Sequence, residues 1–566
     1  MKKNKISING KIYFAEQGQS VLEVAKKNGI NIPSLCYHPD LKPGESCRLC
    51  LVEVKGRKGL FTSCGLTIED GMEIITDSPV IKKARKINLE LIMAQHREEC
   101  NDCVWGFNCR LLELAKEFKV DFDMKDRKSE EPKYNFGPAI HFDSTKCMDC
   151  QNCVQACAQQ VGFLEVQEDG DFFKIGFAKD KDCIYCGQCL MHCPVGAFEG
   201  VGEFEEVDKA LLNENKHVVV QFAPSIRVSI GEEFGMGYGK VVTGQLVAGI
   251  RKLGIDKVFD VSVGADLVTM EEAEELKDRI VNGGVLPMMT SCCPGWVKYV
   301  EYYRPDLIPH LTTVRSPQVL MGGLIKTYWA EKNGIDPKDI IVVSIMPCTA
   351  KKYEITKEEL LVNGIKPVDY VLTTRELAYV MKKKGIDLSK LKPEKANVPL
   401  GDPSGAGVIY GATGGVMESA LRTAYFKITG NNLKKIDFKS VRGINGCKTA
   451  SVKIGDTKIN IAVSSGIKNT ECLLENMKHY HYMEIMACPG GCISGGGQPI
   501  PTTDEIRKMR IAAIYGVDKK KKIRSAHESV EIKELYNTFF KDEKNVHSIC
   551  HTKFSQKKRM GAKKVK

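Results

Sequence analysis

Short apolar runs in the second half of the chain predict buried strands. They cover residues 218–223, 258–261 and 340–345 and are rich in valine and isoleucine. Runs of this length and composition favour strands that are covered on both faces. Helical patterns separate them, for example over residues 271–282. The alternation predicts α/β layers with parallel strands, whose sites lie just past the strand ends.

The first residues follow a different pattern, which predicts a small β-rich domain. Residues 5–14 alternate between apolar and polar positions around an Asn-Gly pair at Asn9, which is a strong hairpin signal. Ser20 and Glu23 have the spacing of a capping box at the start of a helix expected over residues 21–28. The chain is therefore expected to begin with a hairpin followed by a short helix.

Cysteine content narrows the class of protein. The chain has 566 residues, enough for several domains, and 23 cysteines. The basic residues 1–7 are not followed by an apolar run, so no signal peptide is expected, and no stretch of about 18 apolar residues predicts a membrane helix. Clustered cysteines in a cytoplasmic chain indicate metal binding rather than disulfides. We therefore expect a cytoplasmic metalloprotein without a membrane partner.

The net charge of +11 is concentrated towards the C-terminus. We expect this region to be a solvated, partly disordered tail. The alternatives are attraction to an acidic partner such as a ferredoxin and, more weakly because no recognition fold accompanies the charge, nucleic-acid binding. The basic residues are residues 519–522 and Lys557, Lys558, Arg559, Lys563, Lys564 and Lys566.

An internal repeat of cysteines gives the most specific spacing signal. The run Cys147-x2-Cys150-x2-Cys153-x3-Cys157 recurs 36 residues later as Cys183-x2-Cys186-x2-Cys189-x3-Cys193. This is the two-cluster bacterial ferredoxin pattern, in which the fourth cysteine of each run ligates the other cluster. The predicted ligand sets of two 4Fe–4S clusters are Cys147, Cys150, Cys153 and Cys193, and Cys183, Cys186, Cys189 and Cys157.

An earlier group, Cys36, Cys47, Cys50 and Cys64, resembles the ligands of β-grasp ferredoxins that hold a 2Fe–2S cluster. Ten residues separate Cys36 from Cys47, so the spacing departs from the plant-type pattern. Zinc remains an alternative, because thiolate ligands alone do not exclude it.

A histidine joins the next group, which reads His96-x3-Cys100-x2-Cys103-x5-Cys109. A helical pattern over residues 81–95 leads into these ligands. Taken alone, one histidine beside three cysteines fits a zinc site as well as an iron–sulfur cluster.

Three separated segments in the C-terminal half carry four further candidate ligands. Cys293, Cys348, Cys488 and Cys492 offer four thiolates, which suit an iron–sulfur cluster or zinc. Structural zinc sites usually take their ligands as close pairs on short knuckles, whereas these cysteines are far apart in the chain. The arrangement favours a group larger than a zinc ion.

These segments resemble the catalytic signatures of the iron-iron hydrogenases, most closely the clostridial type with several accessory clusters. The resemblance covers the chain up to about residue 540. It implies that Cys293, Cys348, Cys488 and Cys492 hold a 4Fe–4S cubane. It also implies that Cys492 bridges to a two-iron subsite with carbon monoxide, cyanide and a dithiolate, which completes the H-cluster. For the His96 group, the same resemblance favours a 4Fe–4S cluster with one imidazole ligand.

The resemblance also assigns residues around the subsite. Cys292 would pass protons rather than bind metal. Lys351 would donate hydrogen bonds to a cyanide ligand, while Lys352 is expected to be a surface lysine. The other matching pocket residues are Ala223, Pro224, Ser225, Gln318, Met346 and Met486.

For the proton path, the resemblance implies Glu272, Glu275, Arg279 and Thr312 together with Cys292. The first three lie three and four residues apart, so they share one helical face, for which an ordinary solvated salt-bridge face is the alternative. Thr312 stands where the clostridial enzymes tend to carry serine, and it keeps the hydroxyl. Three cysteines match no motif and are expected to be structural or incidental: Cys447, Cys472 and Cys550.

The expected architecture is a multidomain α/β protein. Its domains are a β-grasp 2Fe–2S domain (1–80), a small His/Cys3 4Fe–4S domain (81–125), a two-cluster bacterial ferredoxin-like domain (126–209) and a large α/β catalytic domain with a basic tail (210–566). The expected cofactors are one 2Fe–2S cluster, three accessory 4Fe–4S clusters and the H-cluster.

The expected function is reversible reduction of protons to hydrogen with electrons from ferredoxin, after maturation proteins have supplied the two-iron subsite. One alternative is the catalytic subunit of an NADH-linked bifurcating hydrogenase, although no nucleotide-binding module is visible. The other is a non-catalytic, hydrogenase-like iron–sulfur protein. Such relatives lose the proton-relay thiol and the pocket residues, whereas Cys292, Lys351 and Met486 are present here.

Overall fold

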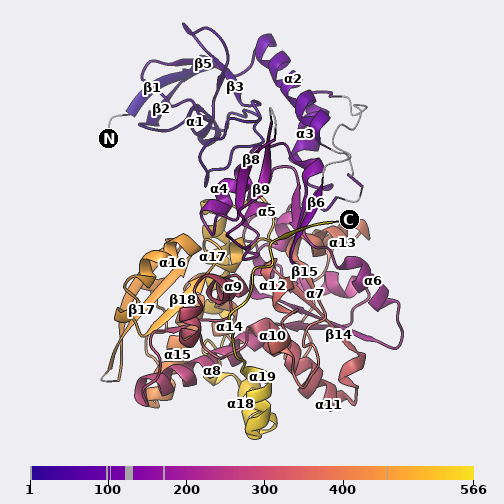
Figure 1. The fold of residues 1–566 in the computed structure, drawn as a ribbon, viewed down its shortest axis with the longest axis vertical. Coiled ribbons are helices and arrows are strands. Elements are labelled where there is room, and N and C mark those ends of the chain that lie inside the picture. The colour runs from indigo at the N-terminus through magenta and orange to yellow at the C-terminus, as the bar shows by residue number, and fades with distance from the viewer. Residues whose placement is uncertain are drawn as a thin grey trace.

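The computed structural model describes residues 3–96, 100–101, 103–120, 132–169, 172–398, 400–455 and 457–565. The boundary expected near residue 125 lies outside these residues. The N-terminal sheet occupies one end of the molecule, the large α/β part occupies the other, and the cysteine repeat lies between them (Figure 1). The protein is thus a multidomain α/β protein, as the sequence predicts.

The N-terminal sheet has the strand order β2-β1-β5-β3-β4. Its hairpin turns at Asn9 and Gly10, with φ values of 52° and 80°, as the Asn-Gly pair predicts. The hydroxyl of Ser20 accepts from the amide of Glu23, and the Glu23 carboxylate accepts from the amide of Ser20 at 2.7 Å, which confirms the capping box. The elements are β1 (Lys3–Ile8), β2 (Lys11–Glu16), α1 (Val21–Lys27), β3 (Leu51–Val54), β4 (Phe61–Thr62) and β5 (Glu73–Ile75).

The cysteine repeat is also a repeat in the backbone. Each helix of the pair, α4 (Asn152–Ala158) and α5 (Gln188–His192), follows a left-handed residue, Gln151 in one case and Gly187 in the other. The two helices therefore begin in the same way within each run of ligands. The surrounding elements are α2 (Pro79–Gln95), α3 (Arg110–Glu117), β6 (Lys133–Phe136), β7 (Ile140–Asp143), β8 (Leu164–Asp169), β9 (Phe172–Phe177) and β10 (Phe198–Gly200).

Two four-stranded sheets form the framework of the large α/β part. The first has the order β12-β11-β14-β15, with all neighbours parallel, and contains the three predicted strands. The second has the order β13-β18-β17-β16, in which only β16 is antiparallel to its neighbour. The strands are β11 (His217–Phe222), β12 (Lys257–Asp260), β13 (Met288–Met289), β14 (Ile340–Met346), β15 (Tyr370–Thr373), β16 (Cys447–Ile454), β17 (Thr457–Ser465) and β18 (Tyr482–Met486).

Helices cover these sheets, and one of them is longer than the sequence pattern predicts. Helix α8 (Ser262–Val281) begins nine residues before the predicted start because residues 262–269 are buried all round, which leaves no amphipathic period to detect. The others are α6 (Phe204–Leu211), α7 (Thr243–Lys252), α9 (Pro294–Tyr303), α10 (Pro317–Leu324), α11 (Ala330–Asn333), α12 (Ala350–Glu354), α13 (Thr374–Lys383), α14 (Gly405–Ile409), α15 (Gly415–Thr429), α16 (Ile467–Leu474), α17 (Asp504–Lys520), α18 (Val530–Asn537) and α19 (Glu543–Cys550). Among the described residues, no helix is both long and apolar enough to cross a bilayer.

The carboxyl ends of strands from both sheets point to one region. Residue 223 follows β11 and residue 348 comes shortly after β14, in the first sheet. Residues 290–293 follow β13, and residue 488 comes shortly after β18, in the second sheet. Parallel strands end at a common edge, so both sheets deliver their loops to the same place.

The C-terminal tail is ordered over the described residues, so the predicted partial disorder is wrong, whereas the predicted exposure of its basic side chains is confirmed at Lys563 and Lys564; Lys566 lies outside the described residues. Strand β19 (Ala562–Lys564) pairs antiparallel with β6 and extends the sheet to the order β10-β7-β6-β19. The Lys557 ammonium lies 2.8 Å from the Glu359 carboxylate, and the Arg559 guanidinium donates to the Lys181 carbonyl at 2.7 Å. Lys519 and Lys520 belong to helix α17 rather than to a tail. The basic residues are therefore mostly fixed by backbone pairing and local partners.

Deleting residues 562–566 should expose strand β6 to solvent. The ladder between Ala562 and Phe136 and the hydrogen bond from the Val565 amide to the Lys133 carbonyl (2.8 Å) are lost. Local opening of β6 should become at least about tenfold more favourable, as expected for losing hydrogen bonds worth ~1 kcal/mol each. Hydrogen exchange of the β6 amides measures this effect.

The matched control is the double substitution Lys563→Ser and Lys564→Ser, which removes the charge but keeps the backbone pairing. Protection in this variant should stay at the level of the unaltered protein. Unchanged protection after the deletion, or equal loss in both variants, would contradict the structural role of β19.

Candidate active site and cluster-binding cysteines

A cavity of about 80 Å³ lies where the strand ends of the two sheets meet. All four predicted ligands of the C-terminal cubane line it, together with Cys292 and Lys351. Every predicted pocket residue lines it as well, namely Ala223, Pro224, Ser225, Gln318, Met346 and Met486. The sequence analysis did not name Val261, Ala265, Pro294 and Pro317, which complete much of the apolar wall.

The four grouped thiols have the donor chemistry of an iron–sulfur cluster. Burial raises the pKa of the Cys488 thiol well above its usual range, and the neighbouring thiols of Cys348 and Cys293 raise it further. Such thiols lose their protons only when a cation compensates the thiolate charge. The group therefore fits a bound iron cluster and gives no stable thiolates without one.

Glycines in the last segment allow neighbouring loops to pack closely. A Cβ on Gly495 would lie 2.2 Å from the Pro347 carbonyl oxygen, and one on Gly496 would lie 2.5 Å from the Cα of Gly187. These glycines therefore allow close contact between ligand-bearing loops. Gly187 directly follows the candidate ligand Cys186.

Lys351 is a buried cation held at the cavity wall. Its ammonium donates to the Cys292 carbonyl at 3.2 Å and to the Glu354 carboxylate at 2.8 Å. Burial alone would lower the pKa of Lys351, but Glu354 outweighs it and the pKa is raised, so the side chain stays protonated. The sequence analysis predicted that Lys352 lies at the surface, and this prediction is wrong. Lys352 is only 1% exposed, and its ammonium lies 3.1 Å from the Glu376 carboxylate.

Glu272 is a fully buried acid on α8. One oxygen of its carboxyl group accepts a hydrogen bond from the Tyr482 hydroxyl at 2.8 Å, and the other has no hydrogen-bond partner among the described residues. Burial raises its pKa to about 8, so the carboxyl group is protonated at neutral pH. The solvated salt-bridge alternative is therefore wrong for Glu272. Burial also raises the pKa of the Cys292 thiol, and the nearby Glu272 adds to this shift.

Glu275 continues from Glu272 towards the surface. Its carboxylate accepts from the Thr312 hydroxyl at 2.7 Å and pairs with Arg279 at 2.5 Å. The hydroxyl of Thr313 also donates to Glu275 at 3.0 Å and lies 2.8 Å from Nδ1 of His551. The structure thus brings the predicted path residues together. Sequence reasoning missed Thr313 and His551 because nearly 240 residues separate them in the chain, and only the fold makes them neighbours.

The cysteine repeat forms the two predicted groups. The pKa of the Cys153 thiol is raised by burial and then by Cys147, Cys150 and Cys193, so these four thiols are close together. The second group behaves alike: the pKa of Cys189 is raised by burial and then by its neighbours Cys183, Cys186 and Cys157.

This second group lies against the candidate active site. The Cys488 thiol is 3.7 Å from the Cys186 carbonyl oxygen. The Gln188 side chain donates to the Ser494 carbonyl at 3.1 Å, and the Thr349 hydroxyl donates to the Tyr185 carbonyl at 2.7 Å. Loops that carry ligands of two different groups are thereby in direct contact.

The four cysteines of the first N-terminal group are buried together, and in the second group His96 has a defined hydrogen bond. Cys36, Cys47, Cys50 and Cys64 are all buried, and the Cys47 amide donates to the Cys36 sulfur at 3.4 Å. His96 ends α2, and its Nδ1 lies 2.9 Å from the Lys146 carbonyl. Donation from Nδ1–H leaves the lone pair on Nε2, the usual arrangement of a ligating histidine.

The unassigned cysteines lie apart from these groups. Cys550 is buried at the end of α19. Cys447 and Cys472 lie at the protein surface with their sulfur atoms 3.7 Å apart. Their geometry is compatible with the structural or incidental role expected for them.

Family models match the chain in successive segments. They are described as a 2Fe-2S iron-sulfur cluster binding domain (residues 2–79), an NADH-ubiquinone oxidoreductase-G iron-sulfur binding region (85–123), a 4Fe-4S dicluster domain (146–197), an iron only hydrogenase large subunit, C-terminal domain (216–496) and an iron hydrogenase small subunit (504–557). Together with the grouped cysteines, they define a multi-cluster iron–sulfur oxidoreductase.

Relatives identify the family. The chain is 40% identical to the NADP-reducing hydrogenase subunit HndD of Solidesulfovibrio fructosivorans, over 98% of this chain and 99% of that one. It is 38% identical to iron hydrogenase 1 of Clostridium pasteurianum, over 97% and 100% of the two chains. A solved structure of the [FeFe]-hydrogenase HydA1 from Chlamydomonas reinhardtii matches with a TM-score of 0.56 and 38% identity, covering 62% of this chain and 98% of that one. The chain belongs to the iron-only hydrogenase family.

Replacing Glu272 by glutamine should block proton delivery while preserving the site. Glutamine keeps the size of the side chain and can still accept from Tyr482, but it cannot exchange a proton. Hydrogen evolution should fall by roughly 10²–10⁴-fold, the usual contribution of a positioned acid or base. In the unaltered protein, hydrogen evolution should decline as the pH rises through about 8, where Glu272 loses its proton.

Glu274→Gln on the exposed side of the same helix is the matched control, since that carboxylate pairs with Lys277 and Lys427 at the surface. The control should retain the turnover and pH profile of the unaltered protein. Full turnover of Glu272→Gln would exclude Glu272 from the path.

Proposed function

We propose that the protein is a ferredoxin-linked hydrogenase that reversibly reduces protons to hydrogen. One observation carries this proposal: four grouped thiols, the extra thiol of Cys292 and the cation of Lys351 line the same cavity. A structural iron–sulfur site needs only the four thiols. The thiol of Cys292 could donate a proton inside the cavity, and the ammonium of Lys351 could stabilise a negative charge there.

The proposed cofactors are those expected from the sequence. Cys293, Cys348, Cys488 and Cys492 would hold the cubane of the H-cluster, which supplies the redox and hydrogen-binding chemistry when bound. Maturation proteins would supply its two-iron subsite. The proposed ligands of the 2Fe–2S cluster are Cys36, Cys47, Cys50 and Cys64. Three accessory 4Fe–4S clusters would have one ligand set each. The first set is His96, Cys100, Cys103 and Cys109; the second is Cys147, Cys150, Cys153 and Cys193; the third is Cys183, Cys186, Cys189 and Cys157.

Protons would move between solvent and the cavity through Arg279, Glu275, Thr312, Glu272 and Cys292. The raised pKa of Glu272 supports its role in this path, because a neutral carboxyl group can give a proton at physiological pH. Lys351 would hold an anionic ligand by charge-assisted hydrogen bonds while remaining paired with Glu354.

Electrons would enter through the N-terminal clusters and reach the cavity through the cysteine repeat. The contact between the Cys488 thiol and the Cys186 carbonyl supports the last step of this route. The four domains proposed at residues 1–80, 81–125, 126–209 and 210–566 would then form one electron-transfer chain. The C-terminal strand β19 pairs with β6 of the third domain.

Turnover with purified redox partners tests this proposal. Protein matured with all clusters should evolve hydrogen from reduced ferredoxin and consume hydrogen with oxidised ferredoxin. Cys492→Ser, which removes one proposed cluster ligand, should abolish both activities. A fully loaded protein without either activity would support the non-catalytic alternative.

A nicotinamide-linked complex is the second candidate function. It is favoured by the 40% identity to a subunit of an NADP-reducing hydrogenase over nearly the whole length of both chains. Native purification distinguishes the two: a complex that contains a flavoprotein and reduces NAD or NADP with hydrogen supports this candidate. A chain that purifies alone and works with ferredoxin contradicts it.

Variants of Cys292 should separate proton transfer from metal binding. Cys292→Ser carries a hydroxyl of much higher pKa, so turnover should fall by roughly 10²–10⁴-fold. Cys292→Asp restores an ionisable group and should recover part of the activity. Both variants should keep the iron content of the unaltered protein. Loss of cubane iron in Cys292→Ser would make Cys292 a ligand, and full turnover would remove it from the proton path.

A further inference from the structure

The N-terminal 2Fe–2S module is held on the cysteine repeat by side-chain amides of one helix, α4. The Gln155 amide accepts from the Lys42 amide at 3.1 Å and donates to the Lys42 carbonyl at 3.3 Å. Gln159 donates to the Asp40 carbonyl at 3.3 Å. These bonds recognise the backbone of residues 36–42, which we call the docking segment. They fix its path regardless of its side chains.

The third amide on this helix, Asn152, makes a different kind of contact. Its Nδ2 donates to the Cys36 carbonyl at 2.9 Å and to the His192 carbonyl at 3.2 Å. Asn152 is only 2% exposed. Turning the amide over would aim its oxygen at two carbonyl oxygens, so the observed orientation is fixed by electrostatics.

Both carbonyls belong to the surroundings of proposed cluster ligands. Cys36 is a proposed ligand of the 2Fe–2S cluster, and His192 directly precedes Cys193, a proposed ligand of the first cubane. Asn152 itself directly precedes another ligand of that cubane, Cys153. A single amide therefore connects the ligand peptides of two different clusters.

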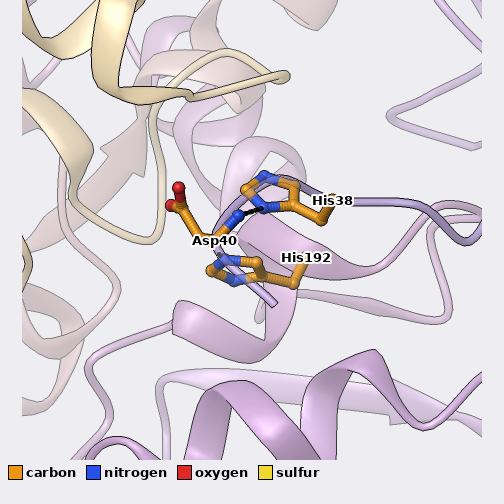
Figure 2. Close-up of side chains that lie close together, drawn as sticks. All are labelled: His38, Asp40 and His192. Atoms are coloured by element: carbon orange, nitrogen blue, oxygen red, sulfur yellow. Dashed lines mark hydrogen bonds and ion pairs between the residues drawn. The ribbon is translucent and has the colours of Figure 1, made fainter. Parts of the chain in front are cut away.

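A second set of contacts also holds this segment, around His38, Asp40 and His192 (Figure 2). The Asp40 carboxylate pairs with Arg507 of α17, and the Asp40 amide donates to Nδ1 of His38 at 3.2 Å. The rings of His38 and His192 meet edge to face, with their centroids 4.3 Å apart. His38, Asp40 and His192 lie close enough to suggest a metal site. Arg507 already neutralises the Asp40 carboxylate, however, so these three side chains help to hold the docking segment in place rather than bind a metal.

We propose that Asn152 is the positioning residue that couples the 2Fe–2S cluster to the first 4Fe–4S cluster. Electronic coupling between two clusters is stronger through covalent and hydrogen bonds than across a gap. The path runs from the Cys36 carbonyl through the Asn152 amide to the adjoining Cys153. One electron leaves the 2Fe–2S cluster and one arrives at the cubane, and no bond is made or broken. This inference depends on the proposed function only for the identity of the two clusters.

The test compares Asn152→Leu with Gln155→Leu in the full-length, cluster-loaded protein. Each substitution is close in size and removes two hydrogen bonds. Gln155→Leu loses two bonds to Lys42 of the docking segment, whereas Asn152→Leu loses one to Cys36 and one to His192, both next to proposed cluster ligands. Each should make local opening of the docking segment about tenfold more favourable, as measured by hydrogen exchange. Asn152→Ala serves as a second variant if the leucine variant does not fold.

The decisive readout is electron equilibration between the two clusters. After flash photoreduction, rapid-freeze electron paramagnetic resonance follows the 2Fe–2S and 4Fe–4S signals separately. Asn152→Leu should slow their equilibration several-fold more than Gln155→Leu does. Equal rates in the two variants, or an unchanged rate in Asn152→Leu, would overturn the inference while leaving hydrogen turnover as separate support for the proposed function. Absence of a 2Fe–2S signal in the unaltered protein would overturn both this inference and the proposed 2Fe–2S ligand assignment.

Discussion

The burial of cysteine thiols in groups is the constraint on which the rest of this structure depends. In the cavity and in both halves of the cysteine repeat, burial is the largest cause of the raised thiol pKa values, and neighbouring thiols add to it. The protein interior thus penalises thiolates unless a metal cluster compensates them. Binding of the proposed clusters would therefore stabilise the folded protein, because bound iron would compensate the charge of the buried thiolates.

The two sheets of the large α/β part solve the problem of delivering distant cysteines to one place. Cys348 comes from the first sheet, while Cys293 and Cys488 come from the second. Close contacts between Gly187 and Gly496 then bring the cysteine repeat against the same loops. The proposed proton and electron paths would thereby approach the cavity from different directions: protons along α8, and electrons through the ligand-bearing loops.

Much of this arrangement could be predicted from the sequence, because ligand spacing and strand composition are local signals. The hairpin at Asn9, the three buried strands and the cavity-lining residues follow from such signals or from the family resemblance. Other features depend on long-range packing. The charge of Lys352 predicts a position at the surface. The partner that permits its burial, Glu376, lies on another helix and becomes its neighbour only in the folded protein.

The C-terminal tail was mispredicted for a similar reason. Its composition resembles a disordered tail, while its order comes from pairing with β6, more than 400 residues earlier. The contacts of Asn152 also could not be predicted from the sequence, because its partners Cys36 and His192 become neighbours only in the folded protein.

Infrared spectroscopy of the matured protein tests the central claim most directly, namely that the cavity holds an H-cluster next to a proton-active thiol. The account predicts stretching bands of bound carbon monoxide and cyanide in the unaltered protein. It also predicts that these bands persist in Cys292→Ser and disappear in Cys492→Ser. A fully matured protein without these bands, or with bands that vanish in Cys292→Ser while cubane iron is retained, would contradict it.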